Sequence, residues 1–334
     1  MSIYYNLGEL LSYNCLFNFV IGNRGGGKTY CFKDWAIKDF LKNGNQFIYL
    51  RRYKSELVDS DKFFSDIQLA YPDHEFKVDG RTFKIDGEVA GYAVALSTAL
   101  TKKSVPYPLV NKIGFDEFLV DKGAIHYLPN EVTAFLEFYS TVSRLREGSL
   151  KNEVRVLFMG NNISITNPYF NYFSIRPNLN KRFNKFKNDI MIEYYKSEEF
   201  INKMKATRFG KMIDGTEYAD YAIENKSLFD NDEFVEKRTP NCKYACTVIY
   251  KNIKVGFWTD YKEGLIFASE VIDQSCKWQY CLLNKDAQPN IMLCKNAKKD
   301  FRLSQIIKAF EYGYLRYENM RIKSTALEIV RLII

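Results

Sequence analysis

The chain has 334 residues, 46% of them hydrophobic and 16% aromatic, and a formal net charge of +8 at pH 7. This composition supplies enough apolar surface for packed cores and excludes a disordered chain, and the length predicts about two domains. We find no apolar stretch near the roughly 20 residues of a membrane span and no signal-peptide pattern, so we expect a cytoplasmic protein. The positive charge favours a polyanionic partner. The seven cysteines, scattered and odd in number, indicate reduced thiols rather than disulfides or a zinc site.

The first predicted strand ends in a glycine-rich loop. Residues 16–21 (LFNFVI) precede GNRGGGKT at 22–29, which completes the pattern G-x-x-x-x-G-K-[ST], and residues 30–41 have no proline or glycine. A buried strand, a glycine loop and a helix in this order form a phosphate-binding P-loop, because successive backbone N–H groups point into one concavity. We therefore predict binding of a nucleoside triphosphate. The predicted nucleotide-binding residues of this loop are Gly22, Asn23, Arg24, Gly25, Gly26, Gly27, Lys28 and Thr29, with Thr29 also offering its hydroxyl to Mg²⁺.

Alternating strand-like and helix-like segments continue to about residue 195, as expected of an α/β domain. Short apolar runs around glycine turns look like a hairpin inserted in the sheet. The segments after the P-loop helix are a strand at 46–51, a helix at 54–70, the hairpin runs 75–78, 82–85 and 92–96, strands at 111–115, 154–159 and 189–195, and a helix at 131–144.

Two adjacent acids, Asp116 and Glu117, follow the predicted strand 111–115. An acid at the end of a strand beside the P-loop strand would hold Mg²⁺ opposite Thr29, and a second carboxylate can deprotonate the attacking water. We therefore predict that Asp116 binds the metal and that Glu117 is the catalytic base of ATP hydrolysis. Lys112 and Gly114 interrupt the apolar run that usually precedes such a pair. The alternative is an exposed Asp-Glu pair at a strand end.

Three further polar residues have two interpretations each. Asn161 follows the strand 154–159, where it would either sense the γ-phosphate or serve as a turn residue. Arg144 and Arg146 end a predicted helix. Either arginine would reach the γ-phosphate of a neighbouring subunit in a ring ATPase, or would interact with the helix dipole. No guanine-reading NKxD motif is present, which favours ATP over GTP.

Basic residues cluster at 176–187 and 203–211, among Phe183, Phe186 and Phe209. This pattern suits a nucleic-acid backbone, although a solvated linker surface explains it equally well. The hydrophobic period is lost over 198–228, and strand-like runs followed by helical ones then predict an α+β domain. We therefore predict a P-loop ATPase domain at 1–197, a linker at 198–228 and a second domain at 229–334, with strands at 244–250, 253–259 and 264–268 and helices at 302–312 and 319–332.

Several stretches resemble the DNA-packaging ATPases of small tailed phages of the phi-twenty-nine group, compact relatives of terminase large subunits. The resemblance covers nearly the whole chain and includes long blocks outside the P-loop. The similar stretches are 19–29 (FVIGNRGGGKT), 46–57 (QFIYLRRYKSEL), 115–118 (FDEF), 167–184 (NPYFNYFSIRPNLNKRFN), 207–218 (TRFGKMIDGTEY) and 309–317 (AFEYGYLRY).

This resemblance implies a ring-forming translocase, expected to be a pentamer, that uses ATP and Mg²⁺ to thread double-stranded DNA into a procapsid. The implied fold is a P-loop NTPase sheet of the additional-strand catalytic-glutamate class with helices on both faces, followed by a smaller α+β RNase H-like domain. Implied partners are double-stranded DNA, further copies of the chain and the portal or procapsid, with either the portal or a packaging RNA for the second domain. No membrane partner is expected. The implied location is the host cytoplasm, with transient docking on the procapsid.

The resemblance also implies roles for single residues. Arg144 falls where the family places its trans-acting arginine, with Arg146 as the second candidate. Lys122 falls where the family contacts DNA in the pore, and Lys54 and Lys103 look like positions that act across the subunit interface.

The second domain is implied to be a vestigial nuclease. A working site needs several carboxylates around two metals. The predicted strands 244–250 and 253–259 carry no acid, and Asp260 stands nearly alone. We therefore expect no nuclease activity.

Three other functions remain alternatives. A helicase-like or AAA+ ring remodeller of nucleic acid would predict a helical lid domain after the core. A non-hydrolysing structural component with a relic P-loop would be expected to lose one of its site residues. An assembly ATPase of the inner membrane would need a membrane span.

Overall fold

The computed structural model describes residues 4–99, 107–120, 126–144, 153–161, 167–173, 175, 177–178, 181–216, 219, 223, 234–294 and 296–334. The chain divides into two compact units, one of residues 1–168 with 175–229 and one of residues 169–174 with 230–334. Within these described ranges, no helix combines the length and the apolar character needed to cross a membrane.

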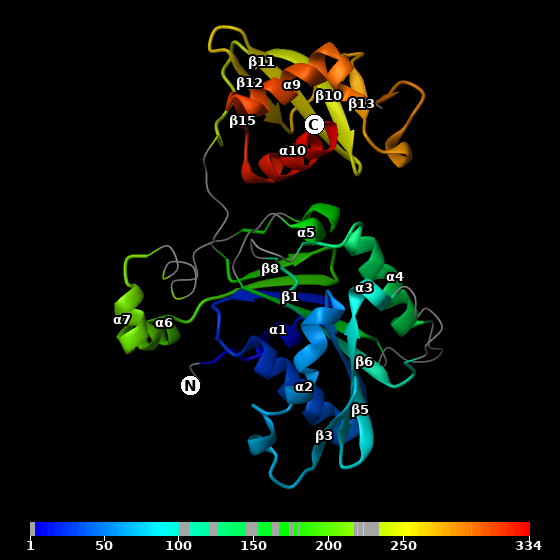
Figure 1. The fold of residues 1–334 in the computed structure, drawn as a ribbon, viewed down its shortest axis with the longest axis vertical. Coiled ribbons are helices and arrows are strands. Elements are labelled where there is room, and N and C mark those ends of the chain that lie inside the picture. Colours follow the sequence, from blue (N-terminus) through cyan, green and yellow to red (C-terminus); the bar gives the residue numbers. More distant parts are fainter. Residues whose placement is uncertain are drawn as a thin grey trace. The chain divides into compact units, whose positions relative to one another are not determined.

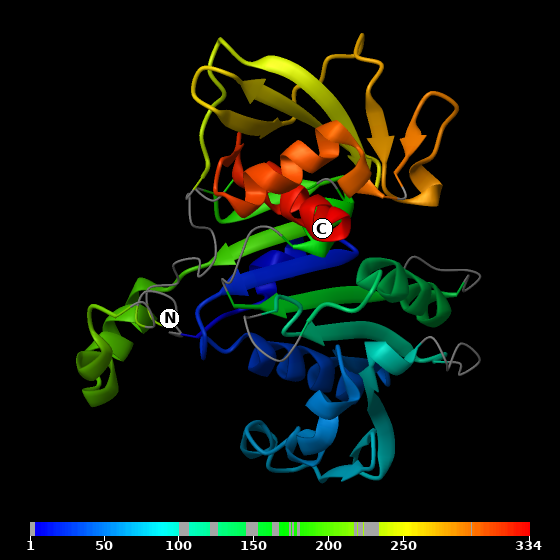
Figure 2. The same cartoon turned by 45° about the horizontal axis from the view of Figure 1, so that its top comes forward.

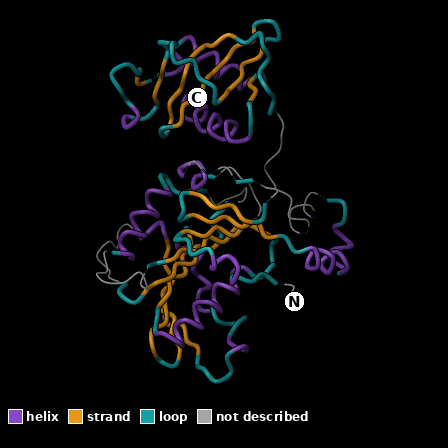
Figure 3. The backbone as a smooth tube through the Cα atoms, turned by 180° about the vertical axis from the view of Figure 1, so that it is seen from behind, coloured by secondary structure: helices purple, strands orange, loops and turns teal. Residues whose placement is uncertain are grey.

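The first unit is built on one large sheet, which confirms the predicted α/β domain (Figure 1). Six neighbouring strands in the order β5-β2-β6-β7-β1-β9 pair in parallel, and β3, β4 and β8 extend the edges through antiparallel pairs. Figure 3 shows these strands side by side from behind. The strands are β1 (Phe17–Gly22), β2 (Gln46–Arg51), β3 (Phe76–Asp79), β4 (Thr82–Ile85), β5 (Glu88–Ala95), β6 (Val110–Asp116), β7 (Arg155–Gly160), β8 (Phe183–Phe186) and β9 (Ile190–Tyr195).

Helices cover both faces of this sheet. Every residue of β1 is buried, as expected for a central parallel strand with packing on each side. Successive residues of β6 face opposite ways: Gly114 lies against Phe32 of α2 (Lys28–Asn43), whereas the Phe115 ring stacks 6.1 Å from Phe135 of α4 (Glu131–Ser143). Since strand side chains alternate, α2 and α4 must lie on opposite faces.

The two residues that interrupt the apolar pattern of β6, Lys112 and Gly114, both lie against α2. The ammonium group of Lys112 is buried, donates hydrogen bonds to Asp39 and Asn111, and lies 5.0 Å from the centre of the Trp35 ring. A Cβ atom at Gly114 would lie 2.5 Å from the nearest Phe32 ring atoms. The lysine is therefore paired inside the fold, and the glycine admits an aromatic ring.

The remaining parts of the first unit differ from the sequence prediction in two places. The predicted helix 54–70 is wrong: the structure has two 3₁₀ helices there, interrupted where Phe63 and Phe64 turn inward to pack on Phe83. The predicted hairpin belongs to the sheet, where β3, β4 and β5 pair antiparallel along one edge. The strand β8 was not predicted. The other helices of this unit are α1 (Gly8–Ser12), η1 (Lys54–Lys62), η2 (Gln68–Ala70), α3 (Leu96–Ala99), α6 (Glu198–Ala206) and α7 (Arg208–Ile213), and α5 (Pro168–Phe173) begins at the last residue before the second unit.

The second unit is a six-stranded mixed sheet with two long helices on one face (Figure 2). The predicted meander is present, because β10, β11 and β12 pair antiparallel in sequence order. Alternate residues of β10, namely Cys246, Val248 and Tyr250, share one core with the apolar residues of α9 and α10. The elements are β10 (Lys243–Tyr250), β11 (Ile253–Asp260), β12 (Leu265–Ser269), β13 (Gln279–Cys281), η5 (Asn284–Asp286), β14 (Met292–Leu293), η6 (Ala297–Lys299), α9 (Phe301–Glu311), β15 (Leu315–Tyr317) and α10 (Met320–Ile333).

The three short strands of the second unit were not predicted. β13 pairs parallel to β10, β14 pairs parallel to β13, and β15 pairs parallel to β12. Each has two or three residues, which is too short for an alternating pattern to stand out from loop sequence.

Replacing Gly114 with alanine should destabilise the first unit by about 1–3 kcal/mol, because the added methyl group would overlap the Phe32 ring. Denaturant unfolding measures this change. In the same chain, Phe32→Leu should recover part of the loss, so the double variant should unfold less easily than the sum of the two single effects predicts. Equal midpoints for the wild type and Gly114→Ala would contradict this account of the packing.

Candidate functional site

The P-loop joins the end of β1 to the first residue of α2. Gly25 and Gly27 have φ values of +72° and +90°, a left-handed conformation that glycine adopts without strain. A Cβ atom at Gly22 would lie 2.6 Å from the backbone oxygen of Tyr195 on β9. The backbone N–H of Tyr5 donates to the Gly26 oxygen at 2.9 Å. The glycines are therefore required both by the conformation of the loop and by the two segments packed against it.

The ammonium group of Lys28 is folded back onto the loop. Its Nζ donates to the backbone oxygens of Gly22 at 2.9 Å and Asn23 at 2.7 Å, and to Oδ1 of Asn161 at 3.3 Å. Burial lowers the pKa of Lys28 to about 8, and the Asp116 carboxylate opposes this shift. A phosphate group could replace these neutral acceptors with a stronger, charged one.

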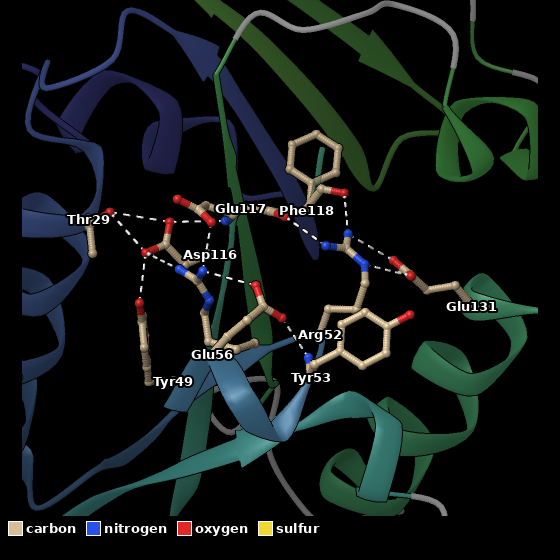
Figure 4. Close-up of polar contacts among 10 residues, drawn as sticks. Thr29, Tyr49, Arg52, Tyr53, Glu56, Asp116, Glu117, Phe118 and Glu131 are labelled. Atoms are coloured by element: carbon tan, nitrogen blue, oxygen red, sulfur yellow. Dashed lines mark hydrogen bonds and ion pairs between the residues drawn. The ribbon is translucent and has the colours of Figure 1, made fainter. Parts of the chain in front are cut away.

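Asp116 and Thr29 supply adjacent oxygen atoms. The Thr29 hydroxyl donates to the Asp116 carboxylate at 3.2 Å, and the Tyr49 hydroxyl donates to the same carboxylate at 2.8 Å (Figure 4). The described residues contain no group of three or more histidine, cysteine or acidic side chains placed to hold a metal ion. Mg²⁺ does not require one, because it is usually held by one or two protein oxygens, water and substrate phosphates. The pair therefore fits a Mg²⁺ ion that accompanies a nucleotide.

Glu117 lies next to this pair but is held by an arginine. Nη2 of Arg51 lies 2.6 Å from the Glu117 carboxylate and 3.0 Å from Glu56, and its Nη1 lies 3.5 Å from Asp116. The Glu117 side chain remains 54% exposed, compared with 12% for Asp116. The Asp116 carboxylate is therefore nearly buried beside Thr29, and the neighbouring Glu117 carboxylate is open to solvent and restrained by a single guanidinium group.

These groups line one cavity of about 700 Å³. Tyr4, Tyr5 and Tyr30 add aromatic surface beside the phosphate-binding loop, as an ATP base and sugar would need. The predicted site residues that the cavity brings together are Arg24, Gly25, Gly26, Gly27, Lys28, Thr29, Asp116, Glu117 and Asn161.

Other predicted residues lie elsewhere. The Asn23 side chain is buried and donates to the backbone oxygen of Ile223 at 2.7 Å, so it supports the loop from behind. Lys54 is exposed at the first position of η1. Arg144 follows the last residue of α4 and is not among the described residues that line the cavity. Arg146, Lys103 and Lys122 lie outside the described residues.

Sequence reasoning did not identify Tyr49, Arg51 and Glu56 as parts of the site. All three come from β2 and the start of η1, and β2 is the sheet neighbour of β6. Tyr49 and Arg51 are two residues apart, so they point to the same side of the strand. The sequence did contain a signal for these side chains, namely two polar residues at this spacing near the end of a predicted parallel strand.

Comparison with known proteins identifies the family of this chain. The sequence model of the family described as podovirus DNA encapsidation protein (Gp16) matches residues 1–333. The DNA packaging protein of Bacillus phage phi29 is 42% identical over 330 residues, which cover 99% of this chain and 98% of that protein. The corresponding protein of Bacillus phage B103 is 41% identical over 322 residues, which cover 96% and 98%.

Solved structures give the same result. A chain of the bacteriophage phi29 viral genome packaging motor assembly superposes with a TM-score of 0.80 and 41% identity, and all of both chains is covered. A chain of the Phi-28 gp11 DNA packaging motor, 19% identical, shares the fold with a TM-score of 0.72 over 99% and 97% of the two chains. The chain therefore belongs to the podovirus DNA encapsidation protein (Gp16) family.

Proposed function

We propose that this chain is an ATP-driven translocase that packages double-stranded viral DNA into the procapsid, with ATP hydrolysed at the subunit interfaces of a homo-oligomeric ring. Family membership and the full-length similarity to a chain of a genome packaging motor support this function. The observation that carries it is the joining of Lys28, Thr29, Asp116 and Glu117 around one cavity. Phosphate binding, metal binding and base catalysis thus have a candidate group each.

The reaction follows from these positions. Lys28 exchanges the loop oxygens for the β- and γ-phosphate oxygens of ATP, and Thr29 and Asp116 hold the metal. A bound Mg²⁺ ion neutralises negative charge on the phosphates. Glu117, released from Arg51, takes a proton from water as the water oxygen attacks the γ-phosphorus. The bond to the bridging oxygen breaks, and ADP and inorganic phosphate result.

The strand order supports the additional-strand catalytic-glutamate class. β7 lies between β1, which precedes the P-loop, and β6, which ends in Asp116. Asn161 directly follows the C-terminal end of β7, where its Oδ1 accepts a hydrogen bond from Lys28. We assign Asn161 to sensing the γ-phosphate, because a phosphate that draws Lys28 away would break this hydrogen bond.

The position of Arg144 supports a role in a neighbouring subunit. α4 runs from the C-terminal end of β6 back to the start of β7, where Tyr139 donates to the backbone oxygen of Val154 at 3.0 Å. Arg144 therefore lies toward the sheet edge opposite the P-loop, since α4 has 13 residues and is about 20 Å long. We assign it as the arginine that stabilises transition-state charge in trans, with Arg146 as the second candidate. By resemblance, Lys122 contacts DNA, and Lys54 and Lys103 act across the interface.

The second unit fits a vestigial RNase H-like domain. Its antiparallel meander with β13 added in parallel beside β10 is the support for this fold. The Asp260 carboxylate accepts hydrogen bonds from the Thr239 hydroxyl and from the backbone N–H groups of Lys262 and Glu263. These bonds give Asp260 a structural role in the turn after β11. We therefore propose no nuclease activity and a role in binding the portal or a packaging RNA.

The proposed assembly is a pentamer that works in the host cytoplasm while docked on the procapsid. We propose an ATPase domain at 1–197, a linker at 198–228 and a second domain at 229–334. α6 and α7 occupy the first part of the proposed linker and group with the first unit.

The full-length protein should hydrolyse ATP faster with linear double-stranded DNA. Its ATPase rate should also rise more than linearly with protein concentration, because a shared site needs a neighbouring subunit.

Glu117→Gln should still bind ATP but should lower kcat by about 10²–10⁴-fold, the usual contribution of a general base. Steady-state phosphate release and ATP-binding titrations measure both. Equal turnover of the variant and the wild type would show that Glu117 is not the catalytic base. An ATPase rate per subunit that changes with neither DNA nor protein concentration would argue against a site shared between subunits.

ATP binding should weaken as the pH rises through about 8, where Lys28 of the free protein loses its proton. The charged form prevails at pH 7 and the neutral form at pH 9, so the apparent Kd should rise by up to about tenfold over this interval. Calorimetric titrations with Mg-ATP measure it, and Lys28→Met, which binds more weakly, should lack this step. A Kd of the wild type that stays constant from pH 7 to pH 9 would contradict this assignment.

Arg144→Ala should abolish hydrolysis in a uniform ring, because every site would lack the arginine of its neighbour. Mixing this variant with subunits that retain Arg144 but carry Lys28→Ala should restore part of the activity, since mixed interfaces combine an intact P-loop with an intact arginine. ATPase assays across mixing ratios measure this complementation. Failure to recover activity at any ratio would exclude the trans role.

A further inference from the structure

The backbone of the proposed catalytic base has an unusual conformation. Glu117 directly follows β6, and its φ angle is +53°, in the left-handed region that side chains other than glycine rarely adopt. Such a conformation is unfavourable and persists only where surrounding contacts impose it. The contacts that impose it here therefore decide where the Glu117 carboxylate can reach.

One buried guanidinium group makes several of these contacts. Arg52 is 1% exposed and donates from Nη1 to the backbone oxygen of Glu117 at 3.1 Å and from Nη2 to that of Phe118 at 2.6 Å (Figure 4). The planar guanidinium presents its N–H donors in a fixed fork, so two successive carbonyl groups are held in one orientation. On the other side, the Phe118 N–H donates to Met159 of β7 at 3.2 Å.

Arg52 is itself held by Glu131. Its Nε lies 2.7 Å and its Nη2 3.2 Å from the two carboxylate oxygens of Glu131, whose side chain is 1% exposed. The Leu128 N–H donates to the same carboxylate at 2.8 Å, just before α4. Each member of this ion pair therefore makes further hydrogen bonds, which a buried ion pair needs to offset its loss of hydration.

The two neighbouring arginines at the end of β2 divide the contacts to Glu117. Arg51, the last residue of β2, binds the Glu117 carboxylate, and Arg52, the residue after the strand, binds the Glu117 main chain. Arg51 must release the carboxylate before catalysis. Arg52 has no such conflict, because neither it nor Glu131 is among the described residues that line the cavity.

We propose that Arg52, held by Glu131, is a positioning residue for the catalytic base: it locks the peptide after Glu117 so that the released carboxylate points at the attacking water. This proposal rests on the proposed ATPase function. It assigns no contact with ATP to Arg52. Loss of the lock should therefore lower kcat and leave the binding of ATP almost unchanged.

The test is steady-state ATP hydrolysis by the full-length protein with linear double-stranded DNA, together with ATP-binding titrations. Arg52→Lys keeps the charge but loses the fork, and it should lower kcat by about 10- to 100-fold, the effect of a small misplacement of a reacting group. KM for ATP should change by less than about twofold. Glu131→Gln leaves the donors of Arg52 in place and should have a smaller effect in the same direction.

A double-variant cycle separates positioning from general stability. If Arg52 acts through the base, adding Arg52→Lys to Glu117→Gln should slow the reaction no further. Asp39→Asn, which removes the charge that pairs with Lys112 at the other end of β6, is the matched control, and any effect it has on kcat should multiply with that of Glu117→Gln. The pair Arg52→Met with Glu131→Met removes the buried charges together and should fold, as thermal unfolding would report, yet remain slow.

The results distinguish the positioning role of Arg52 from the proposed ATPase function. Normal kcat in Arg52→Lys, full additivity with Glu117→Gln, or normal kcat in the folded double-methionine variant would overturn the positioning role while the proposed ATPase function stands. Wild-type protein that hydrolyses no ATP, or no faster than Glu117→Gln, would overturn both.

Discussion

The arrangement of the site depends on two guanidinium groups that sit next to each other at the end of one strand. Arg51 and Arg52 are the last residue of β2 and the residue after it, and they attract acids from three other segments. Charges at such depth are stable only when they are paired, so each acid fixes the segment that carries it. The acids held in this way are Glu56 of η1, Asp116 and Glu117 at the end of β6, and Glu131 at the start of α4.

The two pairs have different consequences because they differ in exposure. The Glu117 carboxylate is half exposed, so its pair with Arg51 is weakened by water and can be exchanged for another partner. The Arg52–Glu131 pair is almost completely shielded from solvent, so water weakens it far less. The end of β2 therefore offers one restraint that can open and one that stays closed, and the proposed catalytic base, Glu117, contacts both.

Much of this site could be predicted from local sequence. The P-loop is a continuous pattern, and Asp116 and Glu117 directly follow an apolar strand, so neither required knowledge of the fold. The partners of these acids could not be found in this way. Tyr49 and Arg51 reach Asp116 only because β2 lies beside β6 in the sheet, and strand order is not encoded in any short stretch. The predicted helix 54–70 failed for a similar reason, since the inward packing of its aromatic residues depends on β4, which follows it in the chain.

The helix α4 connects the segment beside Glu117 to Arg144. Its first residue is Glu131, bound to Arg52 beside the catalytic base, and the residue after its last turn is Arg144. A helix of this length is stiff, so it transmits a tilt at one end as a displacement at the other. In the proposed ring, a change in the peptide after Glu117 would therefore alter the position of Arg144, the residue proposed to act on the ATP of the neighbouring subunit. The helix α4 would thus couple the peptide beside Glu117 and the position of Arg144 within one subunit.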